Sequence, residues 1–222
     1  MPVDQPARVG KVPLAGPELV RSLVFGAEKW ESYFGEVGAE PPLPSDIAAI
    51  LTSPCPIWPG KTVGETHKLV LVPQTVDGIP LTLDLMGELI QRPRQGQATK
   101  YNYYPDYLKE ALRSTSSPAH WILMMKDVIP ASRCQTYPVQ QAQLAALLEG
   151  YQVPRLLEAA ACMLIEHVET GTHLFSGPLT YTRCQEMCGG SQAVVGGFTA
   201  EGLYIYSSVD NATCGVAGLR IF

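Results

Sequence analysis

Proline and glycine interrupt this chain along almost its whole length. The 222 residues contain 20 glycines and 19 prolines. Because proline removes a backbone donor and glycine favours turns, this frequency limits helices and strands to short pieces. It argues against a helical bundle or a coiled coil. Hydrophobic residues make up 46% of the chain and charged residues only 17%, which excludes a disordered chain as well.

The spacing of apolar residues predicts the elements that lie between these interruptions. Residues 17–36 favour a helix that Gly26 weakens and can split, and Asp77–Gly78 predicts a tight turn. We further expect buried strands at 67–72 and 120–129 and short strands at 179–184, 193–198, 202–206 and 215–222. Helices are expected at 46–51, 138–149 and 154–171, the first of them short. Residues 81–90 show apolar alternation, and residues 92–107 are expected to form a long surface loop. In the helix at 154–171 the apolar residues recur at helical spacing, so we expect one buried face. Strands, two helices and then strands again indicate an α+β fold.

The charge balance narrows the range of partners. The formal net charge is −5, so no general attraction to nucleic acid or to an anionic membrane is expected. No segment is long and apolar enough to span a bilayer, and the first 18 residues lack the pattern of a secretory signal. We therefore expect a cytoplasmic monomer or small oligomer, with display at the cell surface by a partner as an open alternative.

The six cysteines and four histidines are the first candidates for chemistry. Cys184 and Cys188 are four positions apart, and the additional metal ligands nearest in the sequence are His167, His173 and Cys214. Zinc sites usually show a tighter pair matched by a second pair, so this spacing favours reduced structural thiols. We predict no metal and no cofactor.

No local motif supports catalysis. His67 and His120 each open a predicted strand, but no partner group that would hold either imidazole as a general base is readable from the sequence, so we interpret both as half-buried. His167 lies on the apolar face of its helix and is interpreted as a core residue. The aspartates show no paired-acid or calcium-loop spacing; they are Asp77, Asp84, Asp106, Asp127 and Asp210.

The segment between Gly202 and Phe222 differs in composition, because it contains no Lys, Glu, Gln, Trp or Met. It combines tyrosines with small polar residues, which is the composition of a binding paratope. Composition alone favours an ordinary polar loop beside two strand tyrosines. The candidate ligand-binding residues are Tyr204, Tyr206, Ser207, Ser208, Asp210, Asn211, Thr213 and Cys214.

Several longer motifs, in order along the chain, resemble a family of bacterial proteins found in environmental chlamydiae. They include WESYFGEVGAEPPLPSDIAAIL, SPCPIWPGKTVGETHKLVLVPQTVDGIPLTLDLMGELI, WILMMKDVIPASR, LLEAAACMLIEHVETGTHLFSGPLTYTRCQE, VVGGFTAEGL and GVAGLRIF. The resemblance covers most of the chain from residue 27 to residue 222. The family resembles C-type lectin fold proteins akin to the variable proteins of diversity-generating retroelements.

This resemblance implies both a fold and a function. It implies a C-type lectin fold at 46–222, in which two helices flank a small mixed or antiparallel sheet and the terminal strand pairs with an early one. Residues 1–45 would be an N-terminal arm and helical extension. It also implies that an error-prone reverse transcriptase rewrites adenines in the codons for about 197–222. The implied function is binding of a protein or another macromolecular ligand with changeable specificity.

Two other classes of protein remain as alternatives. The first is a copper oxidoreductase similar to formylglycine-generating enzymes, which share the lectin-like core. Its copper-binding cysteine pair would have to come from Cys184, Cys188 and Cys214. The second is a structural or assembly protein, which would form large homo-oligomers.

Overall fold

The computed structural model describes residues 17–103, 118–208 and 212–222. Its elements are short, as the proline and glycine content predicts. The helices are α1 (Pro17–Leu23), α2 (Ala27–Tyr33), α3 (Ile47–Thr52), α4 (Val63–Thr66), α5 (Leu83–Leu89), α7 (Tyr137–Leu147) and α8 (Leu156–Thr170). The strands are β1 (Val24–Phe25), β2 (His67–Val72), β3 (Thr75–Val76), β4 (Ile79–Pro80), β5 (Tyr101–Tyr103), β6 (His120–Met125), β7 (Tyr181–Cys188), β8 (Ser191–Thr199), β9 (Gly202–Ser208), β10 (Cys214–Gly215) and β11 (Leu219–Ile221).

Two larger sheets organise these strands. The four-stranded sheet has the order β1-β2-β6-β11, and the five-stranded sheet has the order β10-β7-β8-β9-β5. Each sheet is mixed, because β1 runs parallel to β2, β10 to β7 and β5 to β9, while the other pairs are antiparallel. The terminal strand β11 pairs with β6 from the middle of the chain, and β6 separates it from β2. The α+β class is confirmed.

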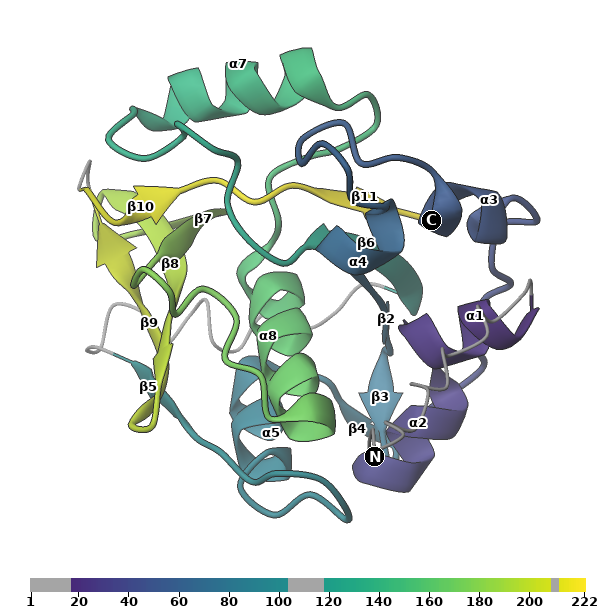
Figure 1. Ribbon diagram of the computed structural model, residues 1–222. Coiled ribbons are helices and arrows are strands. Elements are labelled where there is room, and N and C mark those ends of the chain that lie inside the picture. Colours follow the sequence, from purple (N-terminus) through teal and green to yellow (C-terminus); the bar gives the residue numbers. More distant parts are fainter. Residues whose placement is uncertain (1–16, 104–117, 209–211) are drawn as a thin grey trace, which may run out of the picture.

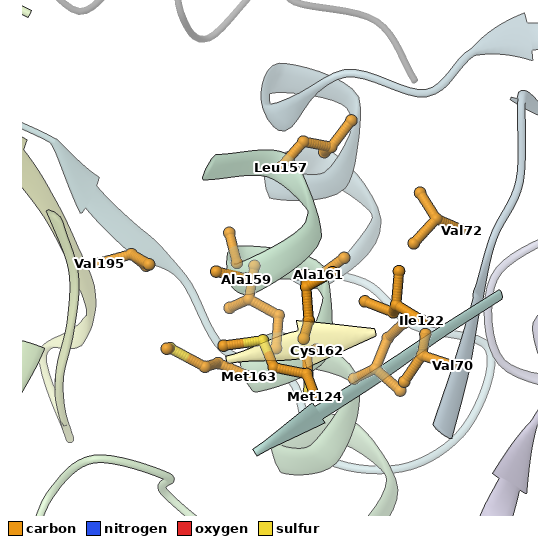
Figure 2. Packing of buried hydrophobic residues seen from close by; sticks show 14 of the residues in the cluster. Val70, Val72, Ile122, Met124, Leu157, Ala159, Ala161, Cys162, Met163 and Val195 are labelled. Carbon is orange, nitrogen blue, oxygen red and sulfur yellow. The ribbon is translucent and has the colours of Figure 1, made fainter. Parts of the chain in front are cut away.

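Helix α8 stands between the two sheets (Figure 1). In Figure 2 its residues Ala161 and Cys162 face Val70 and Ile122 of the four-stranded sheet, while Val195 of β8 lies on the other side. Every residue of α8 from Leu156 to Val168 is buried. The expectation of one buried face is therefore wrong, since a helix packed between two sheets is enclosed all round. Gly171 ends α8 in the left-handed conformation, with φ 77°.

The N-terminal segment shares the core of the rest of the chain. Gly26 divides the predicted helix into α1 and α2, and β1 lies between them. Strand β1 pairs with β2, and Trp30 of α2 is fully buried in the main hydrophobic cluster. The Trp30 indole donates a 2.8 Å hydrogen bond to the Leu71 carbonyl. The core thus runs across the expected boundary at residue 45.

Two other expectations differ from the structure. Apolar alternation at 81–90 suggested a strand, but 83–89 form α5. The Thr82 side chain caps this helix by accepting a hydrogen bond from the Leu85 amide at 3.1 Å, and Leu83 and Met86 are buried on its inner face. Within the predicted surface loop at 92–107, residues 101–103 form β5 because β9 supplies a partner strand. The turn at Asp77–Gly78 is confirmed, with positive φ at both residues between β3 and β4.

Candidate ligand-binding surface

The outward face of the five-stranded sheet carries the predicted tyrosines. In β9, Leu203 and Ile205 are fully buried, whereas Tyr204 and Tyr206 are partly exposed. This alternation follows from the two-residue period of a strand. It confirms that the two tyrosines point to one side and that the core lies on the other.

A small hydrophobic cluster underlies these tyrosines. Its buried members are Tyr181 of β7, Val194 of β8 and Cys214 of β10, and Tyr204 and Tyr206 pack against it. The rings of Tyr181 and Tyr206 meet edge to face, with centroids 5.0 Å apart and planes at 84°. We refer to these five residues as the tyrosine cluster. Four different strands therefore fix this surface.

Cys214 differs from the other candidate residues, because its side chain is fully buried. Burial raises the pKa of its thiol, although hydrogen bonds from Ser208, Tyr206 and Thr213 oppose that shift. The structure thus brings three of the predicted residues together around the thiol of a fourth. Contrary to the expectation that it contacts a ligand, Cys214 supports this surface from below and offers no exposed contact of its own.

The remaining candidates are placed as follows. Ser207, Ser208 and Thr213 are partly exposed. Asp210 and Asn211 lie outside the described residues.

A buried arginine that sequence reasoning did not assign to this surface lies beneath it. Arg183 is 2% exposed, and its Nη1 donates to the Gln135 carbonyl at 2.8 Å and to Gln140 Oε1 at 2.9 Å. Gln140 of α7 in turn donates to the Ser132 carbonyl at 2.7 Å and to the Cys214 carbonyl at 3.3 Å. This network joins α7 to β7 and β10. The sequence signal was an arginine two positions after a strand tyrosine, which places both on one face.

The cysteines are divided between the two faces of the sheet. Cys184 and Cys188 are buried in the main hydrophobic cluster, whereas Cys214 belongs to the tyrosine cluster on the other face. Burial raises the pKa of the Cys184 thiol well above its usual range, so it stays protonated and is a poor metal ligand. Within the described residues, no three histidine, cysteine or acidic side chains are grouped as a metal site would require.

The two strand-opening histidines lie in different environments. His67 is buried, and burial lowers its pKa to about 4. His120 is partly buried; its Nε2 lies 3.1 Å from Glu158 Oε1 and its Nδ1 lies 3.0 Å from the Pro118 carbonyl. The hydrogen bond to Glu158 raises the pKa of His120 against the effect of burial. Neither histidine lies in the tyrosine cluster.

His167 is a core residue, as predicted, with 6% of its surface exposed. Its ring stacks on that of His173 with centroids 4.5 Å apart. The two imidazoles line a pocket of their own, which is described below.

The chain has no match among protein-family models, curated proteins or solved structures. Across the described ranges, no helix has the length and apolar character that a membrane span needs.

Proposed function

We propose that this chain is a ligand-binding protein of C-type lectin-like fold whose C-terminal surface residues are diversified by a retroelement. The observation that carries the proposal is the alternation of buried and partly exposed side chains along β9. Leu203 and Ile205 fill the core, while Tyr204 and Tyr206 face outward together with Ser208. Changes on the outward side leave intact the main hydrophobic cluster, to which Leu203 and Ile205 belong.

The frame behind this surface supports binding with little ordering cost. Neighbouring strands hold β9 on both sides, since β8 pairs with it antiparallel and β5 parallel. Its inner face packs into the hydrophobic core that also contains α8. A surface fixed in this way loses little conformational entropy when a ligand binds. Partly exposed tyrosines with small polar neighbours suit a protein ligand.

The lectin-like fold and the retroelement rest on the resemblance of the sequence motifs. The mixed sheets and adjacent helices are compatible with such a fold. The described candidate residues of β9, together with Thr213, also belong to the set that adenine changes in asparagine codons can produce. That set excludes Lys, Glu, Gln, Trp and Met, and none of these occurs from Gly202 to Phe222.

A matched pair of libraries tests the binding function. The first randomises the outward residues Tyr204, Ser208 and Thr213, and the second randomises the inward residues Leu203, Val195 and Ile205 with the same codon set. We expect most members of the first library to keep the cooperative melt of the parent. Binders to an unrelated soluble protein such as lysozyme should be selectable from it.

The second library serves as the control, and we expect few of its members to fold. Equal loss of folding in both libraries would contradict the proposal. So would a well-folded first library that yields no binders.

Diversification has a separate genomic test. We expect a reverse transcriptase gene beside this one, together with a near-copy of the codons for 197–222 that differs at adenines. Finding neither would overturn the retroelement and leave the binding function to the library experiment.

A further inference from the structure

A polar cavity lies at the opposite end of β9 from Ser208. It has a volume of about 500 Å³, within the roughly 300–1,000 Å³ typical of small-molecule sites. Four segments surround it: the C-terminal end of α8 with the residues that follow it, the segment just after α5, the residues that precede β5, and the turn between β8 and β9. The lining residues are Gln91, Ala98, Thr99, Lys100, His167, His173, Thr199 and Ala200.

Two stacked imidazoles form one wall of this cavity. The planes of His167 and His173 are 17° apart, and both rings contact Phe198, with centroid distances of 4.9 and 4.6 Å. Burial and the neighbouring His173 lower the pKa of His167, so its imidazole is neutral at neutral pH. A neutral imidazole still offers one N–H donor. The Nδ1 of His167 is buried without a hydrogen-bond partner among the described residues.

One cationic side chain also lines the cavity. Lys100 is the one charged residue among the described lining residues. Its ammonium group lies 3.5 Å from Glu201, but these side chains are 54% and 72% exposed, so the ion pair is weak. The backbone beneath is fixed, because the Lys100 carbonyl accepts from the Leu203 amide at 3.0 Å and the Thr99 amide donates to the Ile90 carbonyl at 2.9 Å. Lys100 is therefore held at the cavity and can donate to a ligand.

The donors in this cavity point to an anionic ligand. Lys100 offers an ammonium group, His173 an imidazole, and Thr99 and Thr199 hydroxyl groups. The described lining contains no carboxylate, and the lysine would repel a metal cation. An ammonium group together with imidazole and hydroxyl donors favours carboxylate or phosphate oxygens.

We propose that this cavity binds the anionic oxygens of a small organic phosphate or carboxylate. The volume exceeds what an inorganic phosphate fills, so we assign the anion to a larger molecule whose remaining atoms contact His167, His173 and Ala200. This site is separate from the tyrosine cluster and is independent of the proposed diversification.

Two-dimensional amide NMR of the full chain tests the proposal with three probes, namely inorganic phosphate, glycerol 3-phosphate and glycerate. The last two share a three-carbon skeleton and distinguish a phosphate head group from a carboxylate. We expect at least one of them to shift the amide resonances of 98–100 and 199–200, and to bind more tightly than inorganic phosphate.

Matched variants connect that response to the cavity. Lys100→Gln should weaken binding about tenfold, because it removes a charge-assisted hydrogen bond. Lys61→Gln removes another exposed lysine and should leave binding unchanged. His173→Phe keeps a stacking ring but removes the nitrogen donors, and we expect it to weaken binding without lowering the melting temperature.

Three results would overturn the site. The first is that no probe shifts these resonances. The second is that inorganic phosphate binds as tightly as the organic anions, which means an adventitious ion only. The third is that the two lysine variants weaken binding equally.

Discussion

At the scale of single residues, burial fixes the protonation state of His67. Its Nδ1 lies 2.9 Å from the Thr66 hydroxyl, its Nε2 has no hydrogen-bond partner among the described residues, and its ring meets Trp58 and Tyr151 edge to face. Burial lowers its pKa from 6.5 to about 4. Between these two values the unfolded state binds more protons, so stability must fall as the pH falls.

We therefore expect acidification from pH 6.5 to pH 4 to remove up to about 3 kcal/mol through His67 alone. His67→Phe cannot titrate and should lack this contribution. The measurement is the free energy of unfolding of both proteins in urea across this pH range. Parallel curves for the two proteins would show that His67 is accessible to protons in the folded state.

The edge-to-face contact between the rings of Tyr181 and Tyr206 can also be tested at the scale of single side chains. Edge-to-face aromatic pairs contribute about 0.5–1.5 kcal/mol beyond burial. A double-mutant cycle of Tyr181→Leu and Tyr206→Leu should give a coupling energy in that range, measured by urea unfolding. A cycle of Tyr206→Leu with Tyr33→Leu on α2 is the control and should be additive. A coupling near zero between Tyr181 and Tyr206 would mean that Tyr206 is free to vary without a packing cost.

At the scale of elements, long and strongly periodic segments were predictable from the sequence. The run of six residues from His67 to Val72 forms β2, and the helix expected at 154–171 forms α8. Helix α5 was missed because Leu81, Leu83 and Leu85 alternate with polar residues as in a strand. Strand β5 was missed because its partner, β9, lies about 100 residues further along the chain.

The candidate ligand-binding surface, like the helices and strands, was only partly predictable from the sequence. The common side of Tyr204 and Tyr206 follows from strand periodicity alone. The burial of Cys214 does not, because it depends on the pairing of the two-residue strand β10 with β7. The polar cavity beside His167 and Lys100 does not follow from the sequence either, since its walls come from four segments that only the fold brings together. The local sequence thus determines to which side of a strand a side chain points, whereas strand pairing between distant segments determines which of these side chains are buried.

A charged side chain on the buried helix α8 should unfold the protein. Leu164 is fully buried between the two sheets, so Leu164→Asp would place an unpaired carboxylate in the core at a cost of several kcal/mol. We expect the domain to unfold. Leu147→Asp on α7 is the matched control, because Leu147 is 47% exposed, and it should keep a cooperative thermal melt. A parental melt for Leu164→Asp would mean that α8 is misplaced.

A buried ion cluster ties α8 to β2 and α2. Lys68 of β2 lies 2.6 Å from Glu166 and also pairs with Glu169, which in turn lies 2.5 Å from Lys29 of α2. Burial disfavours the charge on Lys68, but the two carboxylates outweigh this effect and raise its pKa. The Lys68 side chain is 7% exposed and that of Lys29 is 25% exposed. Lys68 should therefore contribute more to the free energy of unfolding than Lys29.

We expect Lys68→Met to destabilise the protein by about 3–5 kcal/mol, because it leaves buried carboxylates without their main partner. Lys29→Met should cost about 1 kcal/mol or less. Urea unfolding at neutral pH measures both. Similar losses for the two variants would contradict the greater burial of the Lys68 pairs.

At the scale of the whole molecule, the C-terminal segment connects the two sheets. After β10 leaves the five-stranded sheet, the chain crosses to β11 in the four-stranded sheet (Figure 1). Val216 and Ala217 are fully buried on the way. Their amides donate to side chains, that of Val216 to Ser132 Oγ at 3.1 Å and that of Ala217 to Thr182 Oγ1 at 2.8 Å. A buried crossing of this kind predicts that the sheets unfold together.

Thr182→Val tests that coupling, because it keeps the shape of the side chain but leaves the Ala217 amide unsatisfied, at a cost of about 1–3 kcal/mol. Trp30 and Trp121 report on the four-stranded sheet, since both are fully buried beside it, whereas tyrosine absorbance includes the rings of the tyrosine cluster on the five-stranded sheet. We expect tryptophan fluorescence and tyrosine absorbance to give one midpoint in the parent, and Thr182→Val to lower both by the same amount. The control is Thr52→Val, whose hydroxyl is exposed at the end of α3 and which should leave both midpoints unchanged. If Thr182→Val lowered only the tyrosine midpoint, the sheets would be independent folding units, and changes on the outward surface could not affect the four-stranded sheet.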